Sequence, residues 1–264
     1  MRNIPSPNPD RPFLPAIDID TRVGVCPHHT RTQTPEQLIA MLDQYDIASA
    51  VTYRSEARLR PDQFNAVMRR DAAGSGGRIR YCCILDPGLG AHSLPGEGDL
   101  RARLLRERPV AVRVEARSAF VPFTPFFFEH ICCVLNELCL PLLIPADELD
   151  SYDQLREMAE AFPDMPLVLL HGAMCRTRAL EPLLRKLPNF YADFGVMLSM
   201  DFLEDLSRAG VGMRQIMIGS GLPAFVPAGS LAVATYANIP LEDRRAILAG
   251  TWERLESEIR YDNL

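Results

Sequence analysis

The chain has 264 residues, 47% of them hydrophobic, and a formal net charge of -6. This size fits one large α/β domain, and an acidic chain without a basic stripe argues against a nucleic-acid partner. No apolar run approaches the roughly 20 residues that span a bilayer, and the N-terminus lacks the apolar region of a signal peptide. We therefore expect a cytoplasmic protein with no membrane partner.

The N-terminal residues 1–15 contain five prolines. Proline fixes φ and removes a backbone donor, so this segment is predicted to be an extended arm. The seven cysteines include two adjacent pairs, Cys82-Cys83 and Cys132-Cys133, and no Cys-x-x-Cys. This placement indicates free, buried thiols in a reducing compartment.

The rest of the chain alternates short apolar runs with helical patterns. The apolar runs, predicted as strands, start near residues 16, 48, 79, 109, 140, 166, 189 and 214. Helices are predicted over 35–45, 61–70, 99–107, 126–138, 150–162, 177–186, 200–208, 241–250 and 252–259. Eight βα units with strands apolar on both faces predict a (β/α)8 TIM barrel, forming a single domain over residues 16–264.

An open doubly wound sheet is the competing architecture. That sheet would be expected to carry a Gly-x-Gly-x-x-Gly turn after a strand, and the sequence has none. The barrel is therefore the preferred fold.

Polar side chains gather where the predicted strands end, which in a TIM barrel is the functional face. They are Asp20, Arg22, Tyr53, Arg54, Asp86, Arg113, Glu115, Asp147, His171, Asp193 and Ser220. The convergence of so many polar groups on one mouth is typical of a small-molecule site.

Several segments resemble the amidohydrolase-related branch of the amidohydrolase superfamily, which comprises metal-dependent (β/α)8 hydrolases and decarboxylases. Residues 16–24 (AIDIDTRVG) resemble its IDxHxHxG first strand, and residues 162–172 (FPDMPLVLLHG) resemble FPDLPIVLxHG. Further similar segments are 109–114 (PVAVRV, to GVRL), 140–145 (LPLLIP, to LPVLIH), 188–193 (PNFYAD, to PNVYxD), 216–223 (IMIGSGLP, to ILxGSDxP) and 248–255 (LAGTWERL, to GNAxRL). The resemblance also implies a homodimer.

The resemblance implies a divalent ion held by two first-strand histidines, a fifth-strand histidine, often a sixth-strand histidine and an eighth-strand aspartate. The corresponding residues here are Asp20, Arg22, Pro145, His171 and Gly221. Only His171 is retained, and the guanidinium of Arg22 would repel a metal. We expect no catalytic metal and no other cofactor.

Two functions remain open. In the first, the protein is a metal-free hydrolase of a small anionic ester or lactone. His171 acts as acid or base, and Asp20 or Asp193 orients it. Substrate would be bound by Arg22, Arg54, Arg113, Glu115 and Ser220.

In the second, the barrel is catalytically silent and serves as a scaffold or ligand-binding protein. Asp20 and Arg22 would then form a structural ion pair in place of the metal. Two minor alternatives are a displaced metal site at Cys26, His28 and His29, and a nucleophilic Cys175 paired with His171.

Overall fold

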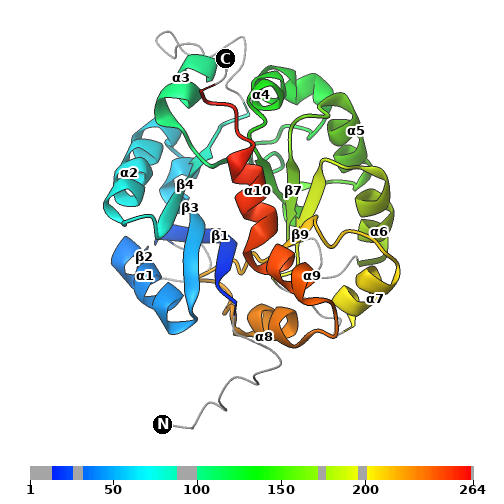
Figure 1. The fold of residues 1–264 in the computed structure, drawn as a ribbon. Helices are drawn as coiled ribbons and strands as arrows, with labels where there is room; N and C mark the ends of the chain where they lie inside the picture. Colours follow the sequence, from blue (N-terminus) through cyan, green and yellow to red (C-terminus); the bar gives the residue numbers. More distant parts are fainter. Residues whose placement is uncertain (1–13, 26–31, 88–99, 172–176, 196–200, 263–264) are drawn as a thin grey trace.

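The computed structural model describes residues 14–25, 32–87, 100–171, 177–195 and 201–262. Eight strands pair in parallel in chain order (Figure 1). They are β1 (Ala16–Val25), β3 (Ile47–Arg54), β4 (Ile79–Ile84), β5 (Ala111–Arg113), β6 (Leu142–Pro145), β7 (Leu167–Leu170), β8 (Phe190–Asp193) and β9 (Ile216–Met217). All eight predicted strands are confirmed.

Backbone hydrogen bonds between β1 and residues 218–222, which follow β9, close the sheet into a barrel. The amide of Ile19 donates to Ile218 O at 2.8 Å, and the amide of Gly221 donates to Asp20 O at 2.8 Å. The amide of Arg22 donates to Leu222 O at 3.0 Å. This closure joins the end of β9 to β1, so the predicted TIM barrel is confirmed and the open sheet is excluded.

Helices surround the strands (Figure 1). They are α1 (Pro35–Gln44), α2 (Pro61–Gly74), α3 (Leu100–Glu107), α4 (Pro125–Leu138), α5 (Asp153–Ala161), α6 (Thr177–Lys186), α7 (Phe202–Arg208), α8 (Ala228–Tyr236), α9 (Leu241–Arg245) and α10 (Thr251–Ser257). Thr34 caps α1 by accepting from the Gln37 amide, while the Gln37 side chain accepts from the Thr34 amide. Such local signals explain why the start of α1 could be predicted.

Three features were not predicted. Helix α8 is absent from the prediction, and it has no side-chain cap to mark its start. A π-helical turn over Ala246–Gly250 joins α9 to α10, where two separate helices were expected. The two-residue strand β2 (Thr32–Gln33) pairs antiparallel with the end of β1.

Two apolar clusters form the core. The larger lies between the barrel and its helices, and the smaller fills the barrel interior with side chains such as Ile17, Val51 and Met217. Trp252 and Leu255 of α10 belong to the interior cluster and are almost fully buried. Helix α10, red in Figure 1, therefore packs against the barrel through these two side chains, and this packing fixes its position.

The predicted N-terminal arm lies outside the described residues except for residues 14 and 15. The single-domain boundary at residue 16 and the homodimer stay predictions. Phe126 and Phe127 at the start of α4 are exposed, whereas Phe123 and Phe128 are buried. Among the described helices, none combines the length and apolar character that a membrane-spanning segment requires.

Candidate functional site at the barrel mouth

A buried ion-pair network occupies the mouth of the barrel. Asp20, in the middle of β1, is only 4% exposed. Its Oδ1 accepts a hydrogen bond from Nη1 of Arg113 on β5 at 2.8 Å, and its Oδ2 lies 2.7 Å from Nε2 of His171 after β7. One carboxylate therefore joins residues from three strands that are far apart in the sequence.

Arg113 is held on several sides. Its guanidinium lies over the Tyr53 ring at 4.3 Å from the ring centre, and its Nε is 3.5 Å from Oε1 of Glu115. Burial alone would raise the pKa of Asp20, but Arg113 and His171 outweigh it and hold that pKa well below its usual range. Asp20 is therefore ionised at neutral pH.

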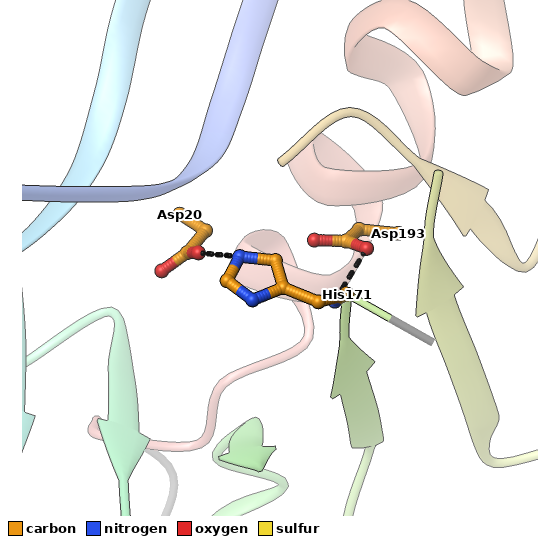
Figure 2. A group of neighbouring side chains, drawn as sticks. All are labelled: Asp20, His171 and Asp193. Carbon is orange, nitrogen blue, oxygen red and sulfur yellow. Dashed lines mark hydrogen bonds and ion pairs between the residues drawn. The ribbon is translucent and has the colours of Figure 1, made fainter. Parts of the chain in front are cut away.

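His171 has an unusual backbone as well as an unusual side chain. Its φ of 58° is in the left-handed region, which non-glycine residues rarely adopt, and its amide donates to Oδ1 of Asp193 at 2.7 Å (Figure 2). Burial would lower the pKa of the imidazole, but the Asp20 carboxylate raises it to about 9. The ring is therefore protonated at neutral pH.

Asp193, at the end of β8, is fully buried and accepts the hydrogen bond from the His171 amide. Burial raises the pKa of this carboxyl to about 8. Its Oδ2 has no hydrogen-bond partner among the described residues. Asp193 therefore supports the strained backbone of His171 while remaining largely protonated at neutral pH.

These shifts predict a fold that is less stable in alkali. The folded-state pKa values of Asp193 and His171 exceed their ordinary values, so the folded protein binds protons that the unfolded chain releases. Stability is lost as pH rises from about 4 to 8 through Asp193, and from about 6.5 to 9 through His171. We expect the Tm to fall by about 10 °C or more between pH 6 and pH 9 in a thermal shift assay.

The matched variants for this measurement are Asp193→Asn and the exposed Asp205→Asn. The amide of the first can still accept from the His171 amide but cannot titrate, so its Tm should fall less between pH 6 and pH 9. Asp205→Asn should follow the wild-type curve. Equal pH dependence in all three proteins would contradict the raised pKa of Asp193.

A cavity of about 630 Å³ opens above this network. Its described lining residues are Asp20, Arg22, Tyr53, Arg58, Arg113, Glu115, Ser118, Pro145, Ala146, Asp147, Glu148, His171, Gly221, Leu222, Ala224 and Phe225. This volume is typical of a small-molecule site.

Arg22 is the cation in this cavity that the described residues leave unpaired. Its Nε is buried without a hydrogen-bond partner, and no ion pair joins Arg22 to a described acid. The carboxylate of Asp20, which the sequence suggested as its partner, is engaged by Arg113 and His171 instead. The expected Asp20–Arg22 ion pair is therefore wrong, although the charge of Arg22 still helps to lower the pKa of Asp20.

The structure brings five of the predicted site residues to the cavity: Asp20, Arg22, Arg113, Glu115 and His171. Two others point elsewhere. Nη2 of Arg54 donates to Asp71 on α2 at 2.8 Å. Ser220 is fully buried, and both its amide and its hydroxyl donate to the carboxylate of Asp18. Arg54 and Ser220 do not line the cavity among the described residues.

The register of β1 explains the separation of Asp18 from Asp20. Strict alternation predicts that Asp18, Asp20 and Arg22 share one side of the strand. A register irregularity between Asp18 and Thr21 interrupts that alternation. Asp20 and Arg22 consequently line the cavity, whereas Asp18 is bound to Ser220 below it.

Sequence reasoning missed Arg58 and Glu148. Arg58 ends a 3-10 turn (Ser55–Arg58) directly after β3, and its Nε pairs with Oε2 of Glu115. Glu148 ends another short turn after β6 and accepts from the amide and hydroxyl of Ser118 at 2.8 and 2.5 Å. Their proximity to strand ends was the available signal, but each lies several residues past its strand.

The side chains at this site fit a divalent ion poorly. Asp20, His171 and Asp193 each offer a ligand atom, and these atoms lie within 4.8 Å of one another. Both oxygens of Asp20 are already engaged, and the cation of Arg113 is 2.8 Å from one of them. His171 and Asp193 would each have to lose a proton to bind a metal at neutral pH. We therefore derive no catalytic step through a metal.

Gly221 occupies the position at which the resemblance implies an aspartate ligand. Its φ is +70°, and an ideal Cβ there would lie 3.1 Å from Nε2 of His171. A side chain at this position would therefore press on the imidazole that contacts Asp20. The alternatives involving Cys26, His28, His29 and Cys175 lie outside the described residues.

The comparisons with known proteins agree with this fold. No family model and no curated protein match the chain. An uncharacterised TIM-barrel protein from Bordetella bronchiseptica matches with 14% identity and a TM-score of 0.69, over 93% of this chain and 99% of that one. A 2,6-dihydroxybenzoate decarboxylase from Rhizobium matches with 12% identity and a TM-score of 0.68, over 92% of this chain and 98% of that one. An amidohydrolase II matches with 14% identity and a TM-score of 0.65, over 92% of this chain and 99% of that one.

These similarities establish the architectural class. The chain has a TIM-barrel fold similar to that of these proteins, so the fold that the motif resemblance implies is confirmed. At 12–14% identity, the chemistry of the matching enzymes is a property of those proteins. The chemistry of this chain has to be argued from its own residues.

Proposed function

We propose that this protein is a small-molecule enzyme that hydrolyses an ester or lactone bearing a carboxylate, without a divalent metal in the reaction. The observation that carries the proposal is the position of Arg22. It is a cation without a described partner, in the same cavity as the Asp20–His171 pair.

Arg22 would bind the substrate carboxylate. Arg113 and Arg58 also line the cavity, but both are paired with acids of this chain. A guanidinium can form two parallel hydrogen bonds to a carboxylate, and such charge-assisted bonds strengthen away from bulk water. An anionic ligand would therefore remove the cost of leaving the buried Nε side of Arg22 uncompensated.

His171 would supply the proton. Its Nε2 faces Asp20, and its other ring nitrogen, Nδ1, makes no contact with that carboxylate (Figure 2). In hydrolysis, water adds to the carbonyl carbon and the bond to the leaving oxygen breaks. The leaving oxygen takes a proton from Nδ1, and Nδ1 regains one from the attacking water. Asp20 stabilises the imidazolium throughout.

A silent ligand-binding barrel is the second candidate. It is favoured by the way in which Asp20 is shared between Arg113 and His171, because such a network can cross-link the mouth without any chemistry. The two candidates agree on ligand binding and differ on turnover. Both candidates predict that the cavity binds a molecule with a carboxylate.

Turnover of a panel of carboxylate-bearing esters and lactones tests the proposal. We expect hydrolysis that persists in EDTA, and a rise in KM of about 10-fold or more for Arg22→Met, as for loss of a charge-assisted pair. Arg208→Met, which changes an exposed arginine of α7, is the matched control. Complete loss of activity in EDTA would refute metal-free hydrolysis, and binding without turnover would favour the silent barrel.

A further inference from the structure

A second hollow of about 610 Å³ adjoins the cavity that contains Arg22. Its described lining residues are Val25, Ser55, Glu56, Arg58, Leu59, Pro61, Ile84, Leu85, Asp86, Pro87, Glu115, Ser118 and Ala119. Arg58, Glu115 and Ser118 line both hollows and form the wall between them. We call the hollow with Arg22 the polar lobe and this second one the side lobe.

The two lobes differ in charge. The described lining of the side lobe carries three carboxylates, those of Glu56, Asp86 and Glu115, and one cation, Arg58. Glu56 pairs with Arg54 at 3.6 Å, and Glu115 pairs with Arg58. The polar lobe contains the unpaired cation Arg22. The described lining of the polar lobe also has acids, but it adds Arg22, Arg113 and His171 to the shared Arg58. A carboxylate is therefore better accommodated in the polar lobe than in the side lobe.

Apolar surface dominates the rest of the side lobe. Ile84 and Leu85 come from the end of β4 and are almost fully buried, and Pro61 begins α2. Leu59, beside them, is 86% exposed, although it is a large apolar residue. Together these residues give the side lobe an apolar wall on which an uncharged chain can pack.

We propose that the side lobe binds the uncharged apolar arm of the same substrate whose carboxylate is bound by Arg22. The substrate class is then an elongated monocarboxylate with an apolar chain, rather than a compact acid or a dicarboxylate. Each lobe alone has the volume of a ligand site, so a compact acid would leave the side lobe empty. The inference rests on the proposed carboxylate site at Arg22.

The wall between the lobes permits such a ligand. Arg58 and Glu115 satisfy each other's charge, and Nη2 of Arg58 lies 3.5 Å from the Ser118 hydroxyl. An apolar chain that passes over this wall therefore does not strip water from an unpaired charge. The aliphatic stem of Arg58 adds apolar surface along the way.

The first test measures the binding of straight-chain carboxylates by calorimetry. Affinity should rise about two- to fourfold per methylene from butanoate to octanoate, the increment for a buried methylene. Octanedioate should bind at least 10-fold more weakly than octanoate, because its second carboxylate meets Glu56 and Asp86. Equal affinity for butanoate and octanoate, or for octanoate and octanedioate, would overturn the inference.

The second test blocks the side lobe. Ala119→Trp should lower octanoate affinity at least 10-fold and leave butanoate affinity unchanged, whereas Ala119→Ser should change neither. If the tryptophan variant does not fold, the exposed Leu59→Asp serves instead, since it adds a negative charge at the lobe without disturbing the core. An octanoate affinity that is unchanged in both variants would overturn the inference.

The failure of this inference can be told apart from failure of the proposed function. If Arg22→Met does not weaken butanoate binding, the carboxylate site itself is wrong. If Arg22→Met weakens butanoate binding but chain length has no effect, the carboxylate site stands and only the side lobe is refuted.

Discussion

Replacement of Arg113 by methionine is expected to lower the free energy of unfolding by about 3–5 kcal/mol, the usual cost of removing one partner from a buried ion pair. Arg113 is 5% exposed and contacts Asp20 at 2.8 Å. Methionine can fill part of the space and keep some contact with the Tyr53 ring. It cannot compensate the buried charges of Asp20 and Glu115, which is why the loss is large.

Denaturant unfolding measures this effect, with Arg208→Met as the control. Arg208 is 74% exposed and pairs with Asp205 within one turn of α7, so its loss should change stability by less than about 0.5 kcal/mol. The double variant Arg113→Met with Asp20→Leu should recover part of the loss, because it removes both charges. A loss below about 1 kcal/mol in Arg113→Met would mean that solvent reaches the network.

The second large effect is expected at His171. His171→Gln should reduce kcat for a hydrolysed ester by about 10²- to 10⁴-fold, as for loss of a general acid or base. Binding of butanoate should change little, because Arg22 and the cavity remain. His130→Gln, an exposed histidine of α4, should behave like the wild type.

The pH profile distinguishes the role of His171. The pKa of this imidazole is raised to about 9, so an acid role predicts that kcat falls as pH rises through about 9. A base role predicts the reverse, with kcat rising over the same range. Unchanged kcat in His171→Gln at every pH would exclude both roles, and the hydrolysis would then depend on other groups of the cavity.

The fold could be predicted because its determinants are local. Each strand is a short run that is apolar on both faces, as in residues 167–170, and each needs a helix to bring the chain back for parallel pairing. Helix starts such as Thr34-Pro35 carry their own capping residues. Helix α8 has no such cap and a nearly uniform apolar composition, so its sequence contained no comparable signal.

The sequence could predict which residues reach the barrel mouth, but it could not predict how those residues pair. Arg113, Glu115 and His171 lie at or just past the end of a barrel strand, and Asp20 and Arg22 lie within the longer β1. The fold brings these residues to one mouth. Their pairing depends on distances between strands. Residues 20 and 22 are close in sequence, yet Asp20 pairs with Arg113 from β5, 93 residues away.

The sequence by itself therefore determined the barrel, the order of its strands and five of the residues that line its mouth. Tertiary structure alone decided which charge compensates which. A register irregularity in β1 separates Asp18 from Asp20, Arg54 turns to Asp71, and Arg22 is left without a partner among the described residues. The physical reason is that hydrophobic periodicity is a local property, whereas the pairing of buried charges depends on positions within a few ångströms across strands remote in sequence.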